Sequence, residues 1–363
     1  MRHLTIQNLG LIKEVDIELK RVTILIGSEF SDKTLVLKVA YFCDWLECQI
    51  ALSQDPQKYS TPETIAKHLI GFHKLEGYMQ DNTYIRYETD LLTFEYTGKS
   101  NQCQIQWAEP ADKHNSYRCP KIAYIPAERN LAMILPNGYQ VPTDGTTLNE
   151  FIKGWESAQQ AFPEKEPILD LGISYQYKET EREGKLLMPD GKELNLSNES
   201  SGLQALVPMY LLIDYLTGKW YNEPNQKAAT QQTPSHTNLY IEEPEAQLNP
   251  TTQKALVYWL VTQLNNQRAH GCMLTTQSPY LLTALNNLIQ ASETIASAPE
   301  KANRVAERFT QQQLLPYEEV AAYTINEGRG VSILDPESRL ITAEPLDSAS
   351  QEIEKDFQSL LDA

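Results

Sequence analysis

Apolar and polar residues alternate at the start of the chain and then give way to a continuous apolar run. Alternation over residues 4–19 predicts half-buried strands, because successive side chains of a strand point to opposite faces. The apolar run over residues 22–26 predicts a strand buried on both faces. A loop over residues 27–34 and an amphipathic helix follow. The pattern therefore predicts a strand, a loop and a helix in succession.

Further along, the pattern predicts most of the remaining elements but leaves one stretch unassigned. Residues 131–190 are weakly periodic, and the polar residues 218–237 predict an exposed loop. Antiparallel strands are predicted over residues 83–96 and 103–107, and further strands over 121–125, 239–241 and 272–276. Helices are predicted over 202–216 and 251–267, a hairpin around 327–330, and a last helix with Ile353, Phe357, Leu360 and Leu361 on one stripe.

Composition and charge narrow the class of protein. The chain has 363 residues, of which 41% are apolar and 22% charged, as in an ordinary globular protein. A formal net charge of −17 disfavours broad adhesion to nucleic acid or to an anionic membrane, without excluding one local basic groove. An apolar run of about 18 residues and a signal-type N-terminus are both missing, which predicts a cytoplasmic protein with no membrane span. The cysteines are scattered without a CxxC pair and predict reduced thiols.

The loop over residues 27–34, GSEFSDKT, lies between a buried strand and a helix, as a phosphate-binding loop requires. In such a loop, backbone N–H groups face the phosphates, a lysine reaches the outer phosphates and a hydroxyl binds Mg²⁺. Gly27, Lys33 and Thr34 have the spacing of G-x-x-x-x-G-K-[ST], but Asp32 stands where the second glycine belongs. Taken alone, the loop is equally compatible with an ordinary strand–turn–helix connection.

A second motif, LYIEEPE over residues 239–245, places two adjacent carboxylates at the end of an apolar strand. One carboxylate can hold Mg²⁺, and the next can polarise an attacking water. Acidic pairs are also common on solvated loops. The position of Glu242 and Glu243 after the candidate phosphate-binding loop favours the catalytic interpretation.

Together these stretches resemble the ABC-type ATPases grouped with the OLD, RecF and SMC-like proteins, often called AAA family ATPases. The matching stretches are GSEFSDKT (27–34), AYIPAERN (123–130), NESSGLQA (198–205), LYIEEPEAQLNP (239–250) and LTTQSPYLL (274–282). The resemblance implies an α/β P-loop NTPase fold of the ABC type, with a mixed sheet, an antiparallel β layer and an α-rich insertion. It also implies an N-terminal ATPase lobe (1–130), an insertion or lid (131–195) and a C-terminal ATPase lobe (196–363).

The resemblance also implies roles for particular residues. Glu243 would be the catalytic base, and Gln277 would stand where the family usually has a histidine that contacts the γ-phosphate. Thr34 and Glu242 would hold Mg²⁺. The serine and glycine after residue 200 resemble the signature loop, which reaches the nucleotide of a dimer partner, although a plain helix N-cap has the same residues. The implied nucleotide contacts are Gly27, Ser31, Asp32, Lys33, Thr34, Ser201, Gly202 and Gln204.

Departures from the family pattern bear on turnover. A carboxylate of Asp32 held about 5 Å from a phosphate would cost about 3 kcal/mol at an effective dielectric constant of about 20. Phe30 replaces another small residue of the loop, and Gln277 can form a hydrogen bond but cannot carry charge. Nucleotide binding is therefore expected to survive better than hydrolysis.

The expected function is an ATP-dependent switch, with ATP and Mg²⁺ as ligands, that forms a head-to-tail homodimer around two nucleotides. Relatives of this kind often serve phage-defence or DNA-repair systems. The chain carries no recognisable nuclease motif, so an effector or nuclease would be a partner protein. The alternative is a degenerate, non-hydrolysing scaffold that holds a partner. Glu128 and Arg129 either line the nucleotide site, contact a partner domain or form a surface pair.

Overall fold

The computed structural model describes residues 2–27, 31–108, 119–133, 145–163, 166–180, 183–222 and 234–342. Its helices are α1 (Lys33–Ser53), α2 (Pro62–Thr64), continued by a π-helix (Ile65–Gly71), α4 (Thr147–Ala161), α5 (Ser201–Thr217), α7 (Pro250–Leu264), α8 (Pro279–Ser297) and α9 (Ala302–Ala306). The strands before α5 are β1 (His3–Leu9), β2 (Ile12–Glu18), β3 (Val22–Ile26), β4 (Met79–Glu88), β5 (Leu92–Thr97), β6 (Gln102–Trp107), β7 (Lys121–Ile125), β8 (Glu166–Ile168), β9 (Ile173–Lys178), β10 (Glu183–Leu187) and β11 (Glu193–Asn195). The later strands are β12 (Thr237–Glu242), β13 (Gly271–Thr276), β14 (Val320–Asn326), β15 (Arg329–Ser332), β16 (Leu334–Asp335) and β17 (Leu340–Ile341).

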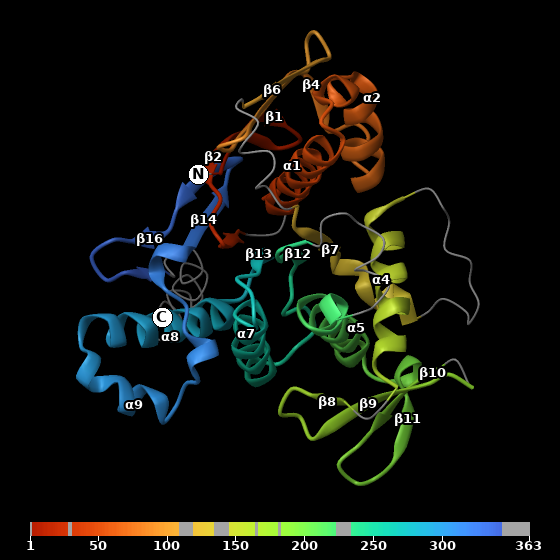
Figure 1. The fold of residues 1–363 in the computed structure, drawn as a ribbon, viewed down its shortest axis with the longest axis vertical. Coiled ribbons are helices and arrows are strands. Elements are labelled where there is room, and N and C mark those ends of the chain that lie inside the picture. The colour runs from red at the N-terminus through yellow and green to blue at the C-terminus, as the bar shows by residue number, and fades with distance from the viewer. Residues whose placement is uncertain are drawn as a thin grey trace, which may run out of the picture.

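One long sheet organises the described residues, in the order β6-β5-β4-β1-β2-β15-β14-β3-β13-β12-β7 (Figure 1). Strands β14, β3, β13, β12 and β7 are parallel to one another. The other part is antiparallel, from β2 through β1, β4 and β5 to β6. Strand β15 joins the two parts, antiparallel to β14 and parallel to β2. Because parallel strands end at the same edge, the loops after β3, β12 and β13 lie close together.

The central strands are buried on both faces, and alternate residues contribute to two separate cores. In β3, Ile24 and Ile26 belong to one core and Leu25 to the other. The first core includes side chains of α5, α7 and α8, and the second includes those of α1 and of the antiparallel strands. The prediction of a strand buried on both faces over residues 22–26 is confirmed.

Residues 131–195 differ from the α-rich insertion that the resemblance implied. Their described part contains helix α4 and a separate antiparallel sheet in the order β11-β10-β9-β8. Helix α4 packs against α5, and the small sheet projects beside them (Figure 1). The insertion was mispredicted because β8, β10 and β11 are short and each has at most one buried residue, so the alternation in β9 had no clear neighbours in the pattern.

The other element predictions within the described residues are confirmed, with ends shifted by a few positions. Helix α7 begins as expected at Pro250, and the side chain of Asn249 caps it by accepting the Thr252 N–H. The predicted hairpin is β14–β15. The last predicted helix, residues 28–30 and residues 223–233 of the predicted loop lie outside the described residues. The described ends of that loop correct the prediction of exposure, because Trp220 and Tyr221 are buried in a 3-10 turn and Thr237 is a buried residue of β12. None of the described helices is both long enough and apolar enough to cross a membrane.

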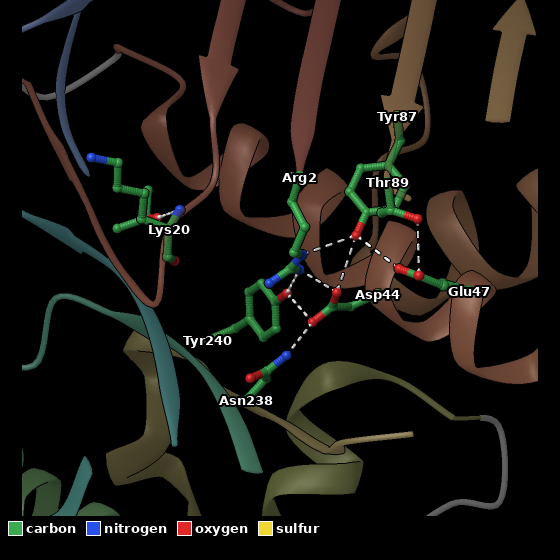
Figure 2. Close-up of polar contacts among 9 residues, drawn as sticks. Arg2, Lys20, Asp44, Glu47, Tyr87, Thr89, Asn238 and Tyr240 are labelled. Carbon is green, nitrogen blue, oxygen red and sulfur yellow. Dashed lines mark hydrogen bonds and ion pairs between the residues drawn. The ribbon is translucent and has the colours of Figure 1, made fainter. Parts of the chain in front are cut away.

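A buried polar cluster joins α1 to the sheet near the beginning of β12 (Figure 2). Asp44 of α1 accepts hydrogen bonds from Arg2, from Asn238 Nδ2 at 2.7 Å and from the Tyr240 hydroxyl at 2.6 Å. A cavity of about 210 Å³ opens beside Arg2, Asn238 and Tyr240. The Asp44 cluster, as it is called below, consists of Arg2, Asp44, Glu47, Tyr87, Thr89, Asn238 and Tyr240.

Candidate functional site

The end of β3 and the start of α1 are packed too closely for a side chain on Gly27. A Cβ atom there would lie 2.5 Å from Ser31 Oγ and 2.7 Å from the Ile325 carbonyl oxygen, so only glycine fits. Ser31 is itself 7% exposed, and its Oγ has no hydrogen-bond partner among the described residues. A buried hydroxyl of this kind costs free energy unless a ligand or water pairs with it. The loop therefore offers a close backbone approach and an unsatisfied polar group.

Asp32 occupies the second glycine position of the loop in a backbone conformation that glycine favours. Its φ of 57° and ψ of 21° lie in the left-handed region, which aspartate tolerates better than most residues. Its Oδ2 accepts a hydrogen bond from the Leu11 N–H at 2.6 Å, in the turn between β1 and β2. The carboxylate is thus engaged by the backbone of another segment, which weakens the repulsion of phosphate expected from the sequence.

Strand β12 delivers its two carboxylates into different surroundings. Glu242 is buried and accepts hydrogen bonds from the Tyr124 hydroxyl and from the Ala127 N–H at 3.4 Å. Burial raises the pKa of Glu242 above its ordinary value, although the hydrogen bond from Tyr124 opposes the shift. The side chain of Glu243, by contrast, is 29% exposed and faces Lys33.

Lys33, Glu243 and Gln277 meet at the edge of the sheet where β3, β12 and β13 end. Lys33 Nζ lies 3.5 Å from Glu243 Oε1, and the lysine side chain is 6% exposed. Gln277 Nε2 donates a hydrogen bond to the same Glu243 oxygen at 2.6 Å. The structure therefore brings together three residues that the sequence placed in one site, and Gln277 orients Glu243.

The backbone of Glu243 is held in an uncommon conformation from both sides. Its φ of 40° is rare for a residue other than glycine and needs support from its surroundings. Its N–H donates to the Thr275 carbonyl oxygen at 3.1 Å. Its own carbonyl oxygen accepts a hydrogen bond from the guanidinium of Arg129 at 2.8 Å.

Arg129 is fully buried behind the two carboxylates, so the sequence-based alternative of a surface pair is wrong for this residue. Burial lowers the pKa of Arg129 to about 10, which leaves the guanidinium charged at neutral pH. Its N–H groups reach carbonyl oxygens on three segments: Pro126 (3.2 Å), Ala205 (3.2 Å), Glu242 (2.9 Å), Glu243 (2.8 Å) and Pro244 (3.4 Å). Arg129 therefore fixes the loop after β12 against β7 and α5.

Glu245 is a further buried acid that the sequence-based assignment of site residues missed. Its Oε1 accepts hydrogen bonds from Thr276 Oγ1 at 2.5 Å and from the Gln277 N–H at 2.9 Å. Its Oε2 has no partner among the described residues, and burial raises its pKa. Glu245 thus positions the backbone of Gln277. The third carboxylate of Glu-Glu-Pro-Glu was the signal available in the sequence.

The predicted signature residues lie at the start of α5. Ser200 caps the helix by accepting a first-turn N–H at 3.5 Å, and Ser201 is exposed. Gly202 packs against Gln247, because a Cβ atom on it would lie 2.8 Å from the Gln247 carbonyl oxygen. Gln204 Nε2 donates to two carbonyl oxygens of its own loop, at 2.8 Å and 2.9 Å. The segment is therefore both a capped helix start and a contact with the loop after β12.

The side chains present suit a magnesium ion shared between protein and phosphates. Among the described residues, no group of three or more His, Cys, Asp or Glu side chains could hold a metal alone. Mg²⁺ usually keeps several waters and binds through one or two protein oxygens together with substrate phosphates. Half-buried Thr34 and buried Glu242, the two residues that the resemblance implies for Mg²⁺, are among the oxygen donors near this edge of the sheet.

No family model matches the chain, and no curated protein matches it in sequence. The SMC head domain from Thermotoga maritima is 11% identical, with a TM-score of 0.43, over 92% of this chain and 98% of that one. An SMC head bound to the C-terminal winged-helix domain of ScpA is 10% identical, with a TM-score of 0.47, over 93% and 98%. The recombination mediator RecF is 9% identical, with a TM-score of 0.37, over 91% and 97%. These structures are similar in fold alone, while the sheet itself confirms the predicted mixed α/β class.

Proposed function

We propose that the protein binds ATP with Mg²⁺ at the edge of the sheet where β3, β12 and β13 end. The observation that carries this proposal is the meeting of Lys33, Glu243 and Gln277 beside a loop with no room for a side chain on Gly27. Ligands of open α/β sheets bind at the carboxyl ends of parallel strands. A triphosphate would supply negative charge to Lys33 and an acceptor to the buried hydroxyl of Ser31.

The proposed hydrolysis begins when a triphosphate replaces Glu243 as the ionic partner of Lys33. The ion pair of Lys33 with Glu243 is worth about 5 kcal/mol at an effective dielectric constant of about 20, before desolvation is counted. A triphosphate carries several negative charges and therefore competes with the single carboxylate for Lys33. Glu243 would keep its hydrogen bond from Gln277 and accept a proton from water at its carboxylate. Mg²⁺, when bound, supplies charge neutralisation of the phosphates, and Thr34 and Glu242 would hold it.

The alternative of a decayed scaffold rests on Asp32 and Gln277, and the geometry of both residues favours the nucleotide site. Asp32 has the left-handed backbone of the glycine it replaces and hydrogen-bonds to the Leu11 N–H. Gln277 Nε2 donates to Glu243, so an amide performs a positioning role there without carrying charge.

We further propose that the protein forms a head-to-tail dimer around two nucleotides. Exposed Ser201 lies at the start of α5, where a hydroxyl and free N–H groups of a helix end can bind an anion. The contact of Gly202 with Gln247 connects this helix start to the loop after β12. Together with the resemblance to the OLD, RecF and SMC-like proteins, these features support a nucleotide-controlled switch. Its expected role is control of a separate effector in phage defence or DNA repair.

Calorimetric titration with ATP and Mg²⁺, followed by phosphate release from the same sample, tests nucleotide binding and turnover. Lys33→Ala should bind ATP at least about 100-fold more weakly, because a charge-assisted contact to phosphate is lost. Lys153→Ala is the matched control, since Lys153 is a partly exposed lysine of α4 that pairs with Glu150. No binding by the wild type, or equal affinity in Lys33→Ala, would show that the loop is not a nucleotide site.

A further inference from the structure

Two cysteines that are distant in the sequence lie against each other at the far end of α1. Cys48 is in the last turns of α1, and Cys119 lies two residues before Lys121, where β7 begins. The Cys119 thiol donates a hydrogen bond to the Cys48 carbonyl oxygen, with Sγ and O separated by 3.3 Å. Both are free thiols, and Cys48 is buried while Cys119 is half-buried. The fold thus pairs a sheltered thiol with a more accessible one.

The two thiols differ in acidity as well as in exposure. A hydrogen bond from the Cys48 thiol holds the pKa of Cys119 below its ordinary value, although burial and Glu47 oppose the shift. The same hydrogen bond, followed by burial, raises the pKa of Cys48. Oxidants react with thiolates, and sensor cysteines are accessible, of low pKa and adjacent to a resolving thiol. Cys119 has the properties of the first thiol and Cys48 those of the second.

We propose that Cys119 and Cys48 form a reversible disulfide when the protein meets a hydroperoxide. The Cys119 thiolate attacks the peroxide, the O–O bond breaks, and a sulfenic acid forms while the leaving oxygen takes up a proton as water or an alcohol. The Cys48 thiol then loses its proton and attacks the sulfenic sulfur. An S–S bond forms, the S–O bond breaks and water leaves. Two thiols lose two electrons in total, and the peroxide gains them.

The other three cysteines are placed differently. Cys43 and Cys272 are buried in the two cores, and the Cys103 thiol donates to the Thr61 carbonyl oxygen at 3.6 Å. A disulfide between Cys48 and Cys119 would join α1, which begins with Lys33, to the segment that leads into β7. The proposal does not depend on nucleotide binding, because it rests on the two thiols alone.

Peptide mapping of the full chain after brief treatment with hydrogen peroxide tests the proposal. Remaining thiols are first blocked with N-ethylmaleimide, and the protein is then cleaved with trypsin and a glutamyl endopeptidase. Cleavage after Glu47 separates Cys48 from Cys43, so the cross-linked peptide identifies its cysteine unambiguously. The expected product is a Cys48–Cys119 cross-linked peptide that dithiothreitol removes.

Variants distinguish the two roles. Cys48→Ser should stop the cross-link and leave a sulfenic acid at Cys119 that dimedone labels. Cys119→Ser should abolish both products, while the matched control Cys103→Ser should keep the cross-link. A wild-type protein that retains both thiols after peroxide treatment would overturn the proposal, and this result needs no variant to fold. A cross-link from Cys119 to any cysteine other than Cys48 would also overturn it.

Discussion

Helix α1 carries charged side chains into the interior at two places, which differ in how completely their polar atoms are paired. In the Asp44 cluster, the buried side chains hydrogen-bond to one another, and within the described residues none of its buried polar atoms is without a partner (Figure 2). At the start of the same helix, Lys33 pairs with Glu243, yet Ser31 Oγ and Glu245 Oε2 lack partners among the described residues.

The difference separates an anchoring cluster from the proposed binding site. Burying charges costs several kcal/mol per ion unless partners and hydrogen bonds compensate, and the Asp44 cluster provides them. Unpaired buried groups are destabilising and therefore require a reason, such as a ligand that completes their pairing. On this basis we interpret Asp44 as an anchor of α1, whereas the unpaired groups of Ser31 and Glu245 lie at the site proposed for the nucleotide. Changes at the two places should consequently affect different measurements.

The largest effect is expected at the proposed nucleotide site, in the rate of phosphate release. Glu243→Gln keeps the shape of the side chain but removes the proposed base, so phosphate release should slow about 100- to 10,000-fold while ATP still binds. An ATP-bound dimer should then accumulate, which size-exclusion chromatography with ATP and Mg²⁺ would detect. The control Glu319→Gln, at a partly exposed glutamate paired with Arg21, should turn over like the wild type. A monomeric Glu243→Gln protein at saturating ATP would contradict the head-to-tail dimer.

At the Asp44 cluster, the expected effect of a substitution is a loss of stability. Asp44→Ala leaves the Arg2 guanidinium without its carboxylate, and the free energy of unfolding should fall by about 3–5 kcal/mol. The ATP affinity of the folded protein should stay within about twofold of the wild type, because the cluster is not part of the proposed site. Denaturant titration measures the first quantity and calorimetry the second. In the control Asp16→Ala, at an exposed position, the loss should be about 0.5 kcal/mol or less. A loss in Asp44→Ala as small as the control would show that the cluster does not anchor α1.

The Asp44 cluster should also make stability depend on pH. Burial, followed by the charge of Asp44, raises the pKa of Glu47 from 4.5 to about 7. The folded state therefore keeps a proton that the unfolded state releases. The stabilisation is full below pH 4.5 and is lost as the pH rises through about 7, by about 3 kcal/mol. Glu47→Gln cannot titrate and should lack this fall. Urea midpoints at about pH 5 and about pH 8 measure it in both proteins. Parallel pH profiles would mean that Glu47 titrates normally.

Arg129 shares a feature with each place: its charge is fully buried, and it hydrogen-bonds to the loop after β12 that belongs to the proposed site. Arg129→Lys replaces five planar donors by three on one nitrogen, which leaves some of the carbonyl oxygens unpaired. Stability should fall by about 1–3 kcal/mol, and phosphate release should slow about tenfold with little change in ATP affinity. Arg339→Lys, at a partly exposed arginine paired with Glu293, is the control. Unchanged phosphate release in folded Arg129→Lys would mean that the hydrogen bonds of Arg129 contribute to stability alone.

Local patterns were enough to predict most of the fold and the parts of the site that lie within one motif. The apolar run of β12 ends at its acidic pair, and Pro250 marks the start of α7, so both could be placed from the sequence. The hydrogen bonds of Arg129 could not be predicted from the sequence, because the carbonyl oxygens that accept them come from segments that only folding brings together. The pairing of Cys48 with Cys119 depends in the same way on long-range packing. No short-range period encodes such contacts.

The smallest effect is expected at Asp32, where the sequence alone predicted a large one. A carboxylate facing the phosphates would weaken ATP binding by about 3 kcal/mol, or roughly 150-fold. Because Asp32 Oδ2 instead accepts the Leu11 N–H, Asp32→Asn should change ATP affinity less than about threefold. Asp32→Gly loses this hydrogen bond but relieves the left-handed backbone, so its stability should stay within about 1 kcal/mol of the wild type. Calorimetry on both variants, with denaturant titration of the second, measures these quantities. If Asp32→Asn instead bound ATP about 100-fold more tightly, the charge would reach the phosphates after all, and the altered loop would be the element that limits nucleotide binding.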